Sequence, residues 1–175
     1  MSVSPLLQAL RSGTQTAHQQ LEDVTLGNKI MDGSLTPAEY HRILAWQRAV
    51  HEVLEPSVVG FTLGEYRYRP RFIPNTQDAA VADELPTTVG RVYVLEGASL
   101  GGSMIYRKLR TNAKLTQEAP FTFYHHQADW GLRQWRSFVG ALNARTFTEE
   151  EIHQAVKSAQ DTFATFARQW AATAG

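Results

Sequence analysis

Three glycines lie within an apolar stretch, Val92 to Tyr106, whose spacing otherwise suits a single helix. A glycine inside a helix costs about 0.5–1 kcal/mol relative to alanine, so Gly97, Gly101 and Gly102 together cost roughly 2–3 kcal/mol. Gly97 and Gly101 are one turn apart and therefore share a face of the predicted helix. The bare backbone on that face predicts that a flat ligand approaches it closely.

Close helix packing is an alternative reason for these glycines, because small residues four positions apart often allow two helices to approach each other. A nucleotide loop fits less well. The order Gly-x-x-x-Gly-Gly matches neither the dinucleotide fingerprint nor the phosphate-binding loop, and no repeating strand and helix units follow it. A helix end at Gly101 and Gly102 is opposed by the helix-compatible pattern that resumes from Met104 to Leu109. We therefore predict one helix with a kink.

Composition narrows the class of protein. The 175 residues predict a single domain over 1–175, with room for a pocket as well as a core. The zero formal net charge argues against non-specific binding to nucleic acid or to an anionic membrane. No apolar run is long enough to cross a bilayer and the first residues do not resemble a secretory signal, so we expect a cytoplasmic protein.

The absence of cysteine excludes disulfides, iron–sulfur clusters and thiolate ligation. A soft or borderline metal would therefore need a histidine ligand. The chain offers six histidines: His18, His41, His51, His125, His126 and His153.

Capping signals predict a mostly helical chain. Ser4-Pro5 opens the first helix, and capping boxes begin at Thr36 and Thr148. The segment 60–86 has a poorer pattern and a basic run at 67–71, which predicts a loop with short helical pieces. The predicted helices cover 5–23, 37–55, 87–109, 124–142 and 149–170.

His18 shares a face of the first helix with Leu10, Arg11 and Thr14, which predicts that it points inward. A lone inward histidine is more often a satisfied core residue than a ligand. Glu22, one turn later, could accept a hydrogen bond from one ring nitrogen and leave the other for a metal. Arg11 could reach an anionic group at the edge of a flat ligand.

Two motifs carry a family resemblance. The residues from Leu10 to Glu22 read Leu-Arg-x-x-Thr-x-x-x-His-x-x-Leu-Glu and resemble the proximal-helix motif of haem oxygenases. The segment 93–102 is similar to that family's distal helix, especially in bacterial members, including those associated with phytochromes. Thr162 to Phe166 also resembles the family's last helix. The resemblance implies an all-α, single-domain haem oxygenase-like fold.

The resemblance implies that haem b lies between the first helix and the kinked glycine-rich helix, with His18 as the iron's only protein ligand. Members of the family open haem with O2 and with electrons from a ferredoxin or an NAD(P)H-dependent reductase, giving biliverdin, carbon monoxide and ferrous iron. Backbone at Gly97 and Gly101 would crowd bound oxygen toward a ring carbon. We expect a monomer or weak dimer, with neither nucleic acid nor membrane as a partner.

Animal-type members carry an aspartate directly after the first distal glycine, where this chain has Ala98. Proton delivery would then use water held by backbone groups, with Ser99 or an arginine of the run 67–71. That run is alternatively a solvated loop or a docking surface for the electron donor. Arg133 is an alternative to Arg136 as a residue facing the haem propionates.

The resemblance implies catalytic roles for Gly97, Ser99 and Gly101. It implies haem contacts for Arg11, Thr14, His18, Glu22, Tyr93, Gly97, Gly101, Gly102, Arg136, Phe163 and Phe166. Ordinary packing is the alternative for the aromatic residues of this set, and a solvated surface position is the alternative for Arg11.

Three other functions are compatible with the sequence. Ala98 is compatible with a haem carrier or sensor of the same fold that has weak or no turnover. Glu150 and His153 have the spacing of a di-iron ligand pair, but no second such pair occurs. A member of the same fold could also handle an unrelated small molecule.

Overall fold

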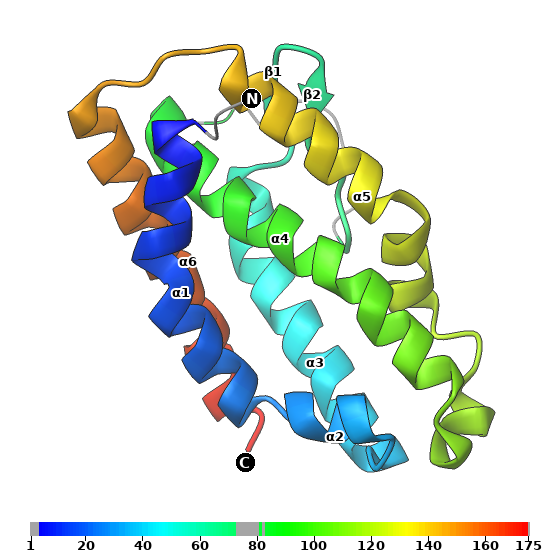
Figure 1. Cartoon of the computed structure of the whole chain (residues 1–175). Helices are drawn as coiled ribbons and strands as arrows, with labels where there is room; N and C mark the ends of the chain where they lie inside the picture. The colour runs from blue at the N-terminus through cyan, green and yellow to red at the C-terminus, as the bar shows by residue number, and fades with distance from the viewer. Residues whose placement is uncertain (1–3, 73–80, 82, 175) are drawn as a thin grey trace.

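The computed structural model describes residues 4–72, 81 and 83–174. α-Helices dominate this part of the chain (Figure 1), which confirms the all-α expectation. The α-helices are α1 (Pro5–Val24), α2 (Gly27–Asp32), α3 (Pro37–Leu54), α4 (Leu85–Arg110), α5 (Thr122–Asn143) and α6 (Glu149–Ala172). The shorter elements are the 3₁₀ helices η1 (Glu55–Ser57) and η2 (Ala113–Glu118) and the antiparallel strands β1 (Thr62–Leu63) and β2 (Tyr66–Arg67).

Three of the predicted helix starts are confirmed by their hydrogen bonds. The helices α4 and α5 each begin two residues earlier than predicted, at Leu85 and Thr122. The Ser4 side chain accepts from the Leu7 amide at 3.2 Å, and complete capping boxes open α3 at Thr36 and α6 at Thr148. Each cap satisfies amides that the first helical turn leaves without a backbone partner. α4 runs without interruption through all three glycines, as predicted.

Two features differ from the sequence-based expectation. α2 begins after Leu26 and ends at Gly33, both in the left-handed region at φ 67° and 76°, so no side-chain cap marks its start. Within 60–86 the described residues form a loop with a short β-hairpin, up to the start of α4 at Leu85. The predicted loop is confirmed, but the short helical pieces are not found among the described residues. The side chains of Tyr66 and Tyr68, in the second half of the hairpin, are buried. Their burial explains why the hairpin packs against the rest of the protein. Residues 73–80 and 82 of the same predicted loop lie outside the described residues.

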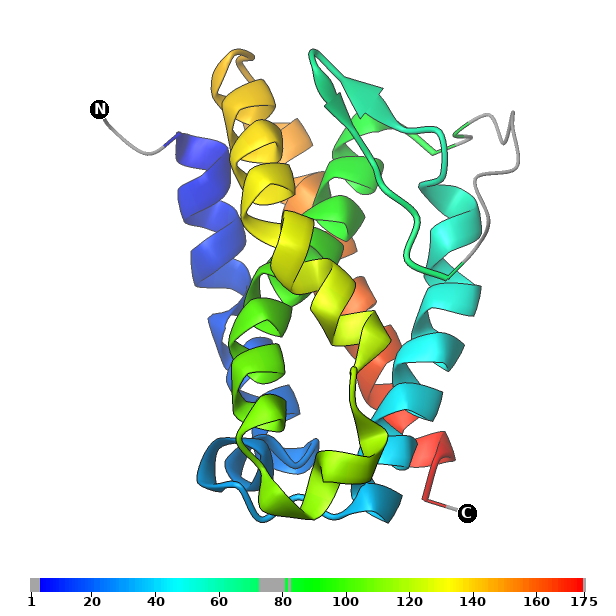
Figure 2. The same ribbon diagram turned by 90° about the vertical axis from the view of Figure 1, so that its right-hand side faces the viewer.

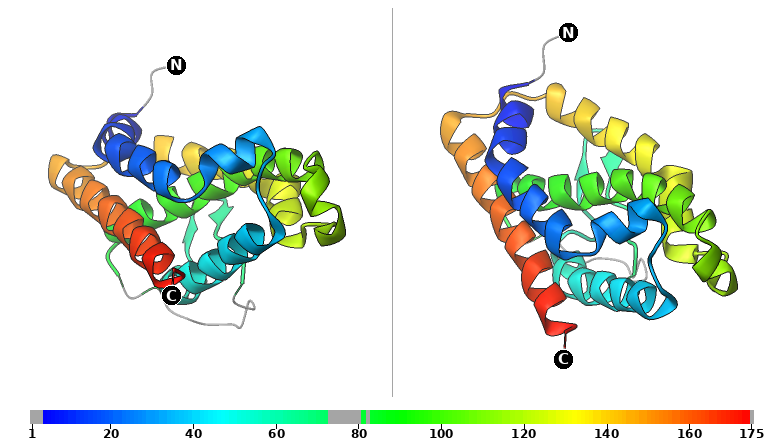
Figure 3. Two further views of the ribbon diagram at one scale, coloured as in Figure 1. Left: turned by 90° about the horizontal axis from the view of Figure 1, so that it is seen from below. Right: turned by 60° about the horizontal axis from the view of Figure 1, so that its bottom comes forward.

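α6 is the element on which the helices assemble. It packs against α1, α3 and α4, while α5 also packs against α4. α1 and α6 lie side by side in the views from the front and from below (Figures 1 and 3). The view from the side shows α5 crossing in front of α4, with α1 to one side of α5 and the hairpin to the other (Figure 2). α4 therefore packs against both α5 and α6.

Two glycines permit α4 to pack closely against its neighbours, Gly90 at α6 and Gly131 at α5. A Cβ on Gly90 would overlap the carbonyl oxygen of Ala155 in α6, and one on Gly131 would lie 2.8 Å from the carbonyl oxygen of Ser99. On the other side of α6, the Trp46 indole donates to the Phe166 carbonyl at 2.8 Å. No helix of the described residues is long and apolar enough to span a bilayer.

Candidate functional site

Gly97 and Gly101 have no packing reason to be glycine. Apart from the helix's own backbone, a Cβ on Gly101 would meet no heavy atom within 4 Å, and one on Gly97 would meet only the Trp135 ring at 3.9 Å. Gly102 is different, because its Cβ would lie 2.5 Å from the Gln127 side chain in α5. Close helix packing thus accounts for Gly102 and leaves the other two unexplained by the protein's own contacts.

His18 is not buried, and its predicted inward orientation is wrong. The buried residues of α1 end at Thr14, and the His18 side chain is 60% exposed. Its ring packs edge-on against Phe163 of α6, with centroids 5.9 Å apart. The spacing identified a helix face correctly, but α6 covers only part of that face. An exposed imidazole at the rim of a helix pair is available to a ligand.

The Glu22 carboxylate lies beside one nitrogen of the His18 ring. The Glu22 carboxylate oxygen lies 3.2 Å from Nε2, across one turn of α1, and its side chain is 56% exposed. A carboxylate on one ring nitrogen fixes the tautomer and leaves the other nitrogen as the acceptor. In this arrangement the carboxylate lies beside Nε2.

Tyr93 of α4 contacts two residues of α1. Its side chain interacts with Thr14 and Arg11. Burial raises the pKa of the Tyr93 phenol, with smaller opposing effects from Thr14 and Arg11. Thr14 is 4% exposed and donates to the Leu10 carbonyl at 2.7 Å, whereas Arg11 is exposed. The hydroxyl of Tyr93 and the guanidinium of Arg11 thus provide polar groups where α1 meets α4.

Trp135 of α5 lies beside Tyr93 and Gly97, although the sequence pattern did not single it out. Its ring lies 5.8 Å from the Tyr93 ring and is the nearest group to the missing Cβ of Gly97. Helical spacing places Trp135 on the apolar face of α5, which indicates a packing role. Only its position beside Arg136 points to a role at the ligand site. Arg136 and Arg133 are both exposed on α5, so the structure leaves the choice between them open.

Ser99 and Phe166 lie away from the other predicted residues. Phe166 is 2% exposed and packs against Trp46 in the core, with ring centroids 5.8 Å apart, whereas its predicted partner Phe163 lies beside His18. Ser99 is buried and, by helical periodicity, faces away from Gly97 and Gly101. Its hydroxyl accepts from Arg71 Nε at 3.1 Å.

Arg71 is the exception within the basic run 67–71, because it is not part of a solvated loop. Its side chain is 1% exposed and pairs with Glu96, which is fully buried. Glu55 anchors the same segment, because its carboxylate accepts from the Arg71 amide at 2.8 Å and from the Phe72 amide at 2.7 Å. Arg67 and Arg69 are exposed as expected for a loop.

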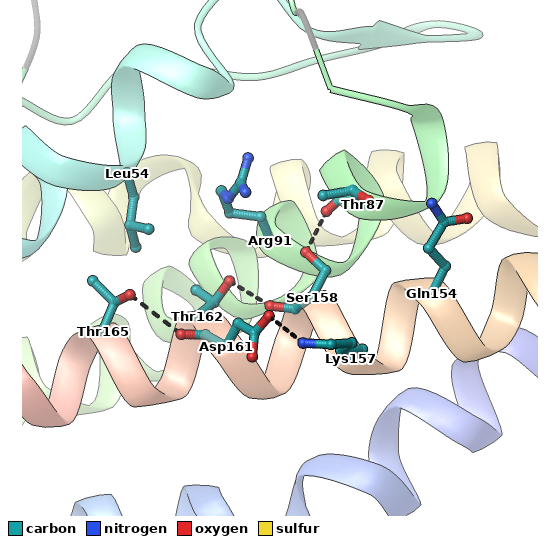
Figure 4. A pocket seen from close by; sticks show the side chains of 9 residues that line it. All are labelled: Leu54, Thr87, Arg91, Gln154, Lys157, Ser158, Asp161, Thr162 and Thr165. Atoms are coloured by element: carbon teal, nitrogen blue, oxygen red, sulfur yellow. Dashed lines mark hydrogen bonds and ion pairs between the residues drawn. The ribbon is translucent and has the colours of Figure 1, made fainter.

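A separate polar pocket lies between α4 and α6 (Figure 4). It has a volume of about 300 Å³, and none of the predicted site residues lines it. Its hydroxyl and charged groups are already used: Ser158 donates to the Thr87 carbonyl, and Lys157 pairs with Asp161 at 3.0 Å. This pocket therefore offers few free groups to a ligand.

No cluster of metal ligands supports the di-iron alternative. Among the described residues, no group of three or more His, Cys, Asp or Glu side chains is placed to hold a metal ion. His153, one member of the proposed pair, is exposed on α6. A metal that belongs to a larger cofactor and takes only one histidine ligand is compatible with His18.

An all-α protein with an exposed, carboxylate-oriented histidine on one helix and unpacked glycines on another has the residues to hold a flat, iron-containing anion. The chain matches the sequence profile named Heme oxygenase over residues 4–75 and 73–172. It therefore belongs to the haem oxygenase family. No curated protein and no solved structure matched the chain.

Proposed function

We propose that this protein opens haem b to biliverdin, releasing carbon monoxide and ferrous iron. The observation that carries the proposal is the contrast among the α4 glycines. Gly97 and Gly101 leave open space that no protein group fills, whereas Gly90 and Gly102 face close neighbours. Membership of the haem oxygenase family gives that space a matching substrate.

The side chains around this space have distinct proposed tasks. His18 would bind the iron through a neutral ring nitrogen while Glu22 holds the other. Arg11 and Tyr93 would bind the carboxylates at the haem edge, and Phe163 would pack against the ligand beside His18. The bound haem supplies the oxygen-activating chemistry. The protein's share is therefore binding, orientation and control of water.

The backbone of α4 would limit where on the haem ring the reaction occurs. With no side chain at Gly97 or Gly101, main-chain atoms can approach the ring face and limit the directions open to a small molecule there. Arg136, or its alternative Arg133, would contribute a second contact to the haem carboxylates. Rotation of the ring in its site would then depend on these edge contacts.

Proton delivery does not use Ser99 in this proposal. Its hydroxyl is buried, held by Arg71, and turned away from Gly97. Ala98, which stands where animal-type relatives have an aspartate, is exposed and carries no proton donor. We therefore assign proton transfer to water that hydrogen-bonds to α4 backbone groups. Electrons would come from a ferredoxin or an NAD(P)H-dependent reductase.

The function is tested by titrating the purified protein with hemin and then supplying reductant and O2. We expect a spectrum with one histidine ligand, followed by loss of the haem band, appearance of biliverdin and release of carbon monoxide. The reductant is tested as ascorbate and as reduced ferredoxin. A hemin complex that stays intact under both would refute the enzymatic proposal.

A haem carrier or sensor is the second candidate, and Ala98 is the observation that favours it. A carrier would bind hemin through His18 and transfer it to apomyoglobin without loss of the porphyrin. Oxygenation and transfer give different products, biliverdin or intact haem, so one time course distinguishes them. Failure to bind hemin at all would reject both candidates.

A further inference from the structure

A second cavity lies between α3, the segment after β2, and α5. Its volume is about 500 Å³, within the usual range for small-molecule sites. His18, Gly97 and Gly101 do not line it. We call it the α3–α5 cavity. Its lining includes Arg48, Arg69, Phe72, Thr122, Phe123 and Trp130.

Two arginines give the α3–α5 cavity a positive lining. Arg48 lies over the Phe72 ring at 4.9 Å and Arg69 lies over the Trp130 ring at 5.3 Å. Neither forms an ion pair with any described residue, and no Asp or Glu of the described chain lines the cavity. Arg71 also lines it, but Glu96 neutralises that charge. Two charges held against aromatic rings remain available to an anion.

The start of α5 adds a third positive feature. Thr122 and Phe123, the first two residues of this 22-residue helix, line the cavity. No side chain caps this end, and its first turn contains no acidic residue. The first amides of a helix have no backbone partner, and the helix dipole favours negative charge there. The residues that begin α5 and the two arginines thus line the same cavity.

Three aromatic rings form a large part of the remaining wall. Phe72 and Phe123 are stacked, with centroids 4.7 Å apart and ring planes 23° apart. Trp130 lines the cavity on the side of Arg69. Such a wall favours a flat ring system, whereas a simple inorganic ion would leave it exposed to water.

We propose that the α3–α5 cavity binds a flat aromatic anion, a small ring system that carries a carboxylate or phosphate. The acidic group lies between Arg48, Arg69 and the first amides of α5. The ring lies against Phe72, Phe123 and Trp130. This site does not depend on haem or on its oxidation.

Isothermal titration calorimetry tests the proposal on hemin-loaded and haem-free protein. The probes are 2-naphthoate, AMP, the uncharged 2-naphthalenemethanol and inorganic phosphate. We expect 2-naphthoate or AMP to bind at least about tenfold more tightly than the uncharged alcohol or phosphate, because both ring and charge contribute. The stronger of the two identifies the source as an aromatic carboxylate or a nucleotide.

Two substitutions locate the binding. Arg48→Gln and Arg69→Gln should each weaken the better probe by about tenfold, whereas Arg107→Gln, an exposed α4 arginine outside the cavity, should not. Amide NMR shifts should be largest at Thr122 and Phe123. Circular dichroism confirms that each variant is folded.

Three results would overturn the proposal. The first is no binding of either charged aromatic probe below about 1 mM. The second is unchanged affinity in both Arg48→Gln and Arg69→Gln. The third is binding that disappears when hemin is loaded, because the probe would then have occupied the haem site.

Discussion

Arg71 and Glu96 form an ion pair whose side chains are 1% and 0% exposed, on a face of α4 turned away from Gly97 and Gly101. Arg71 also donates to Ser99 one turn further along, with Nη2 3.0 Å from the hydroxyl. The segment after β2 therefore packs against the side of α4 that is turned away from Gly97 and Gly101. The opposite side of that helix is left free for a ligand.

Arg71→Met should destabilise the protein by about 3–5 kcal/mol, because it leaves the Glu96 carboxylate buried without its partner. Urea denaturation at pH 7 measures the effect. Arg67→Met is the matched control, since Arg67 is exposed, and its change should stay within about 0.5 kcal/mol. Adding Glu96→Leu to Arg71→Met should recover much of the loss. A loss below about 1 kcal/mol for Arg71→Met alone would contradict the assigned role.

Alanine substitutions at Gly101 and Gly90 should have opposite effects on stability. Gly101→Ala should stabilise the haem-free protein by up to about 1 kcal/mol, because the added methyl meets nothing and helix propensity improves. Gly90→Ala should destabilise it by about 1–3 kcal/mol or more, because the methyl overlaps the Ala155 carbonyl. Thermal unfolding of both variants measures this.

The same Gly101 position tests the ligand face. Gly101→Leu should leave the haem-free fold intact but weaken hemin binding by at least about tenfold, because its side chain fills the proposed space. Absorbance titration gives the affinity. Unchanged hemin affinity would show that the ring does not lie over this helix face.

His18→Ala should abolish the axial-ligand spectrum of the hemin complex while changing stability by less than about 0.5 kcal/mol, because the side chain is largely exposed. Added imidazole should restore the spectrum by taking the vacated position. His153→Ala, an exposed histidine of α6, is the control and should bind hemin normally. A wild-type spectrum in His18→Ala would reject the ligand assignment.

Arg11→Gln should weaken hemin binding, since Arg11 lies beside Tyr93 where α1 meets α4. Arg136→Gln should do the same, whereas Arg133→Gln should not, if Arg136 is the residue that faces the propionates. Each loss is expected at about tenfold. Hemin titrations of the three variants under one salt condition give the comparison. The reverse order for the two α5 arginines would exchange their roles.

Stability should decline between pH 6.5 and pH 4 through His51. Burial lowers its pKa to about 4, with Arg71 adding to the decrease and Glu55 and the Gln47 carbonyl opposing it. The unfolded chain takes up the proton near pH 6.5, so stability present above that pH is lost as the pH falls toward 4. The shift corresponds to about 3 kcal/mol.

The measurement compares urea unfolding of the wild type and His51→Gln from pH 7.5 to 4.5. The variant should lose less stability over this range, since the exposed histidines contribute equally to both proteins. Parallel pH profiles would mean that His51 is not buried as a neutral side chain.

Local signals predicted the helices well. Ser4, Thr36 and Thr148 supplied caps within one turn of the residues they serve, so their effect does not depend on distant packing. The same signals do not reveal α2, which no side chain caps, or the hairpin, which forms because Tyr66 and Tyr68 are buried by other elements. These features depend on tertiary contacts.

The sequence by itself determined the helical class, the family motifs and the placement of Gly97 and Gly101 on one face of a continuous helix. Only the tertiary structure decided that this face is unpacked, that His18 is exposed, that Trp135 borders Gly97, and that Arg71 is buried. Helical periodicity fixes which residues share a face. Which faces are covered depends on contacts between residues far apart in the chain, and no local pattern records those contacts.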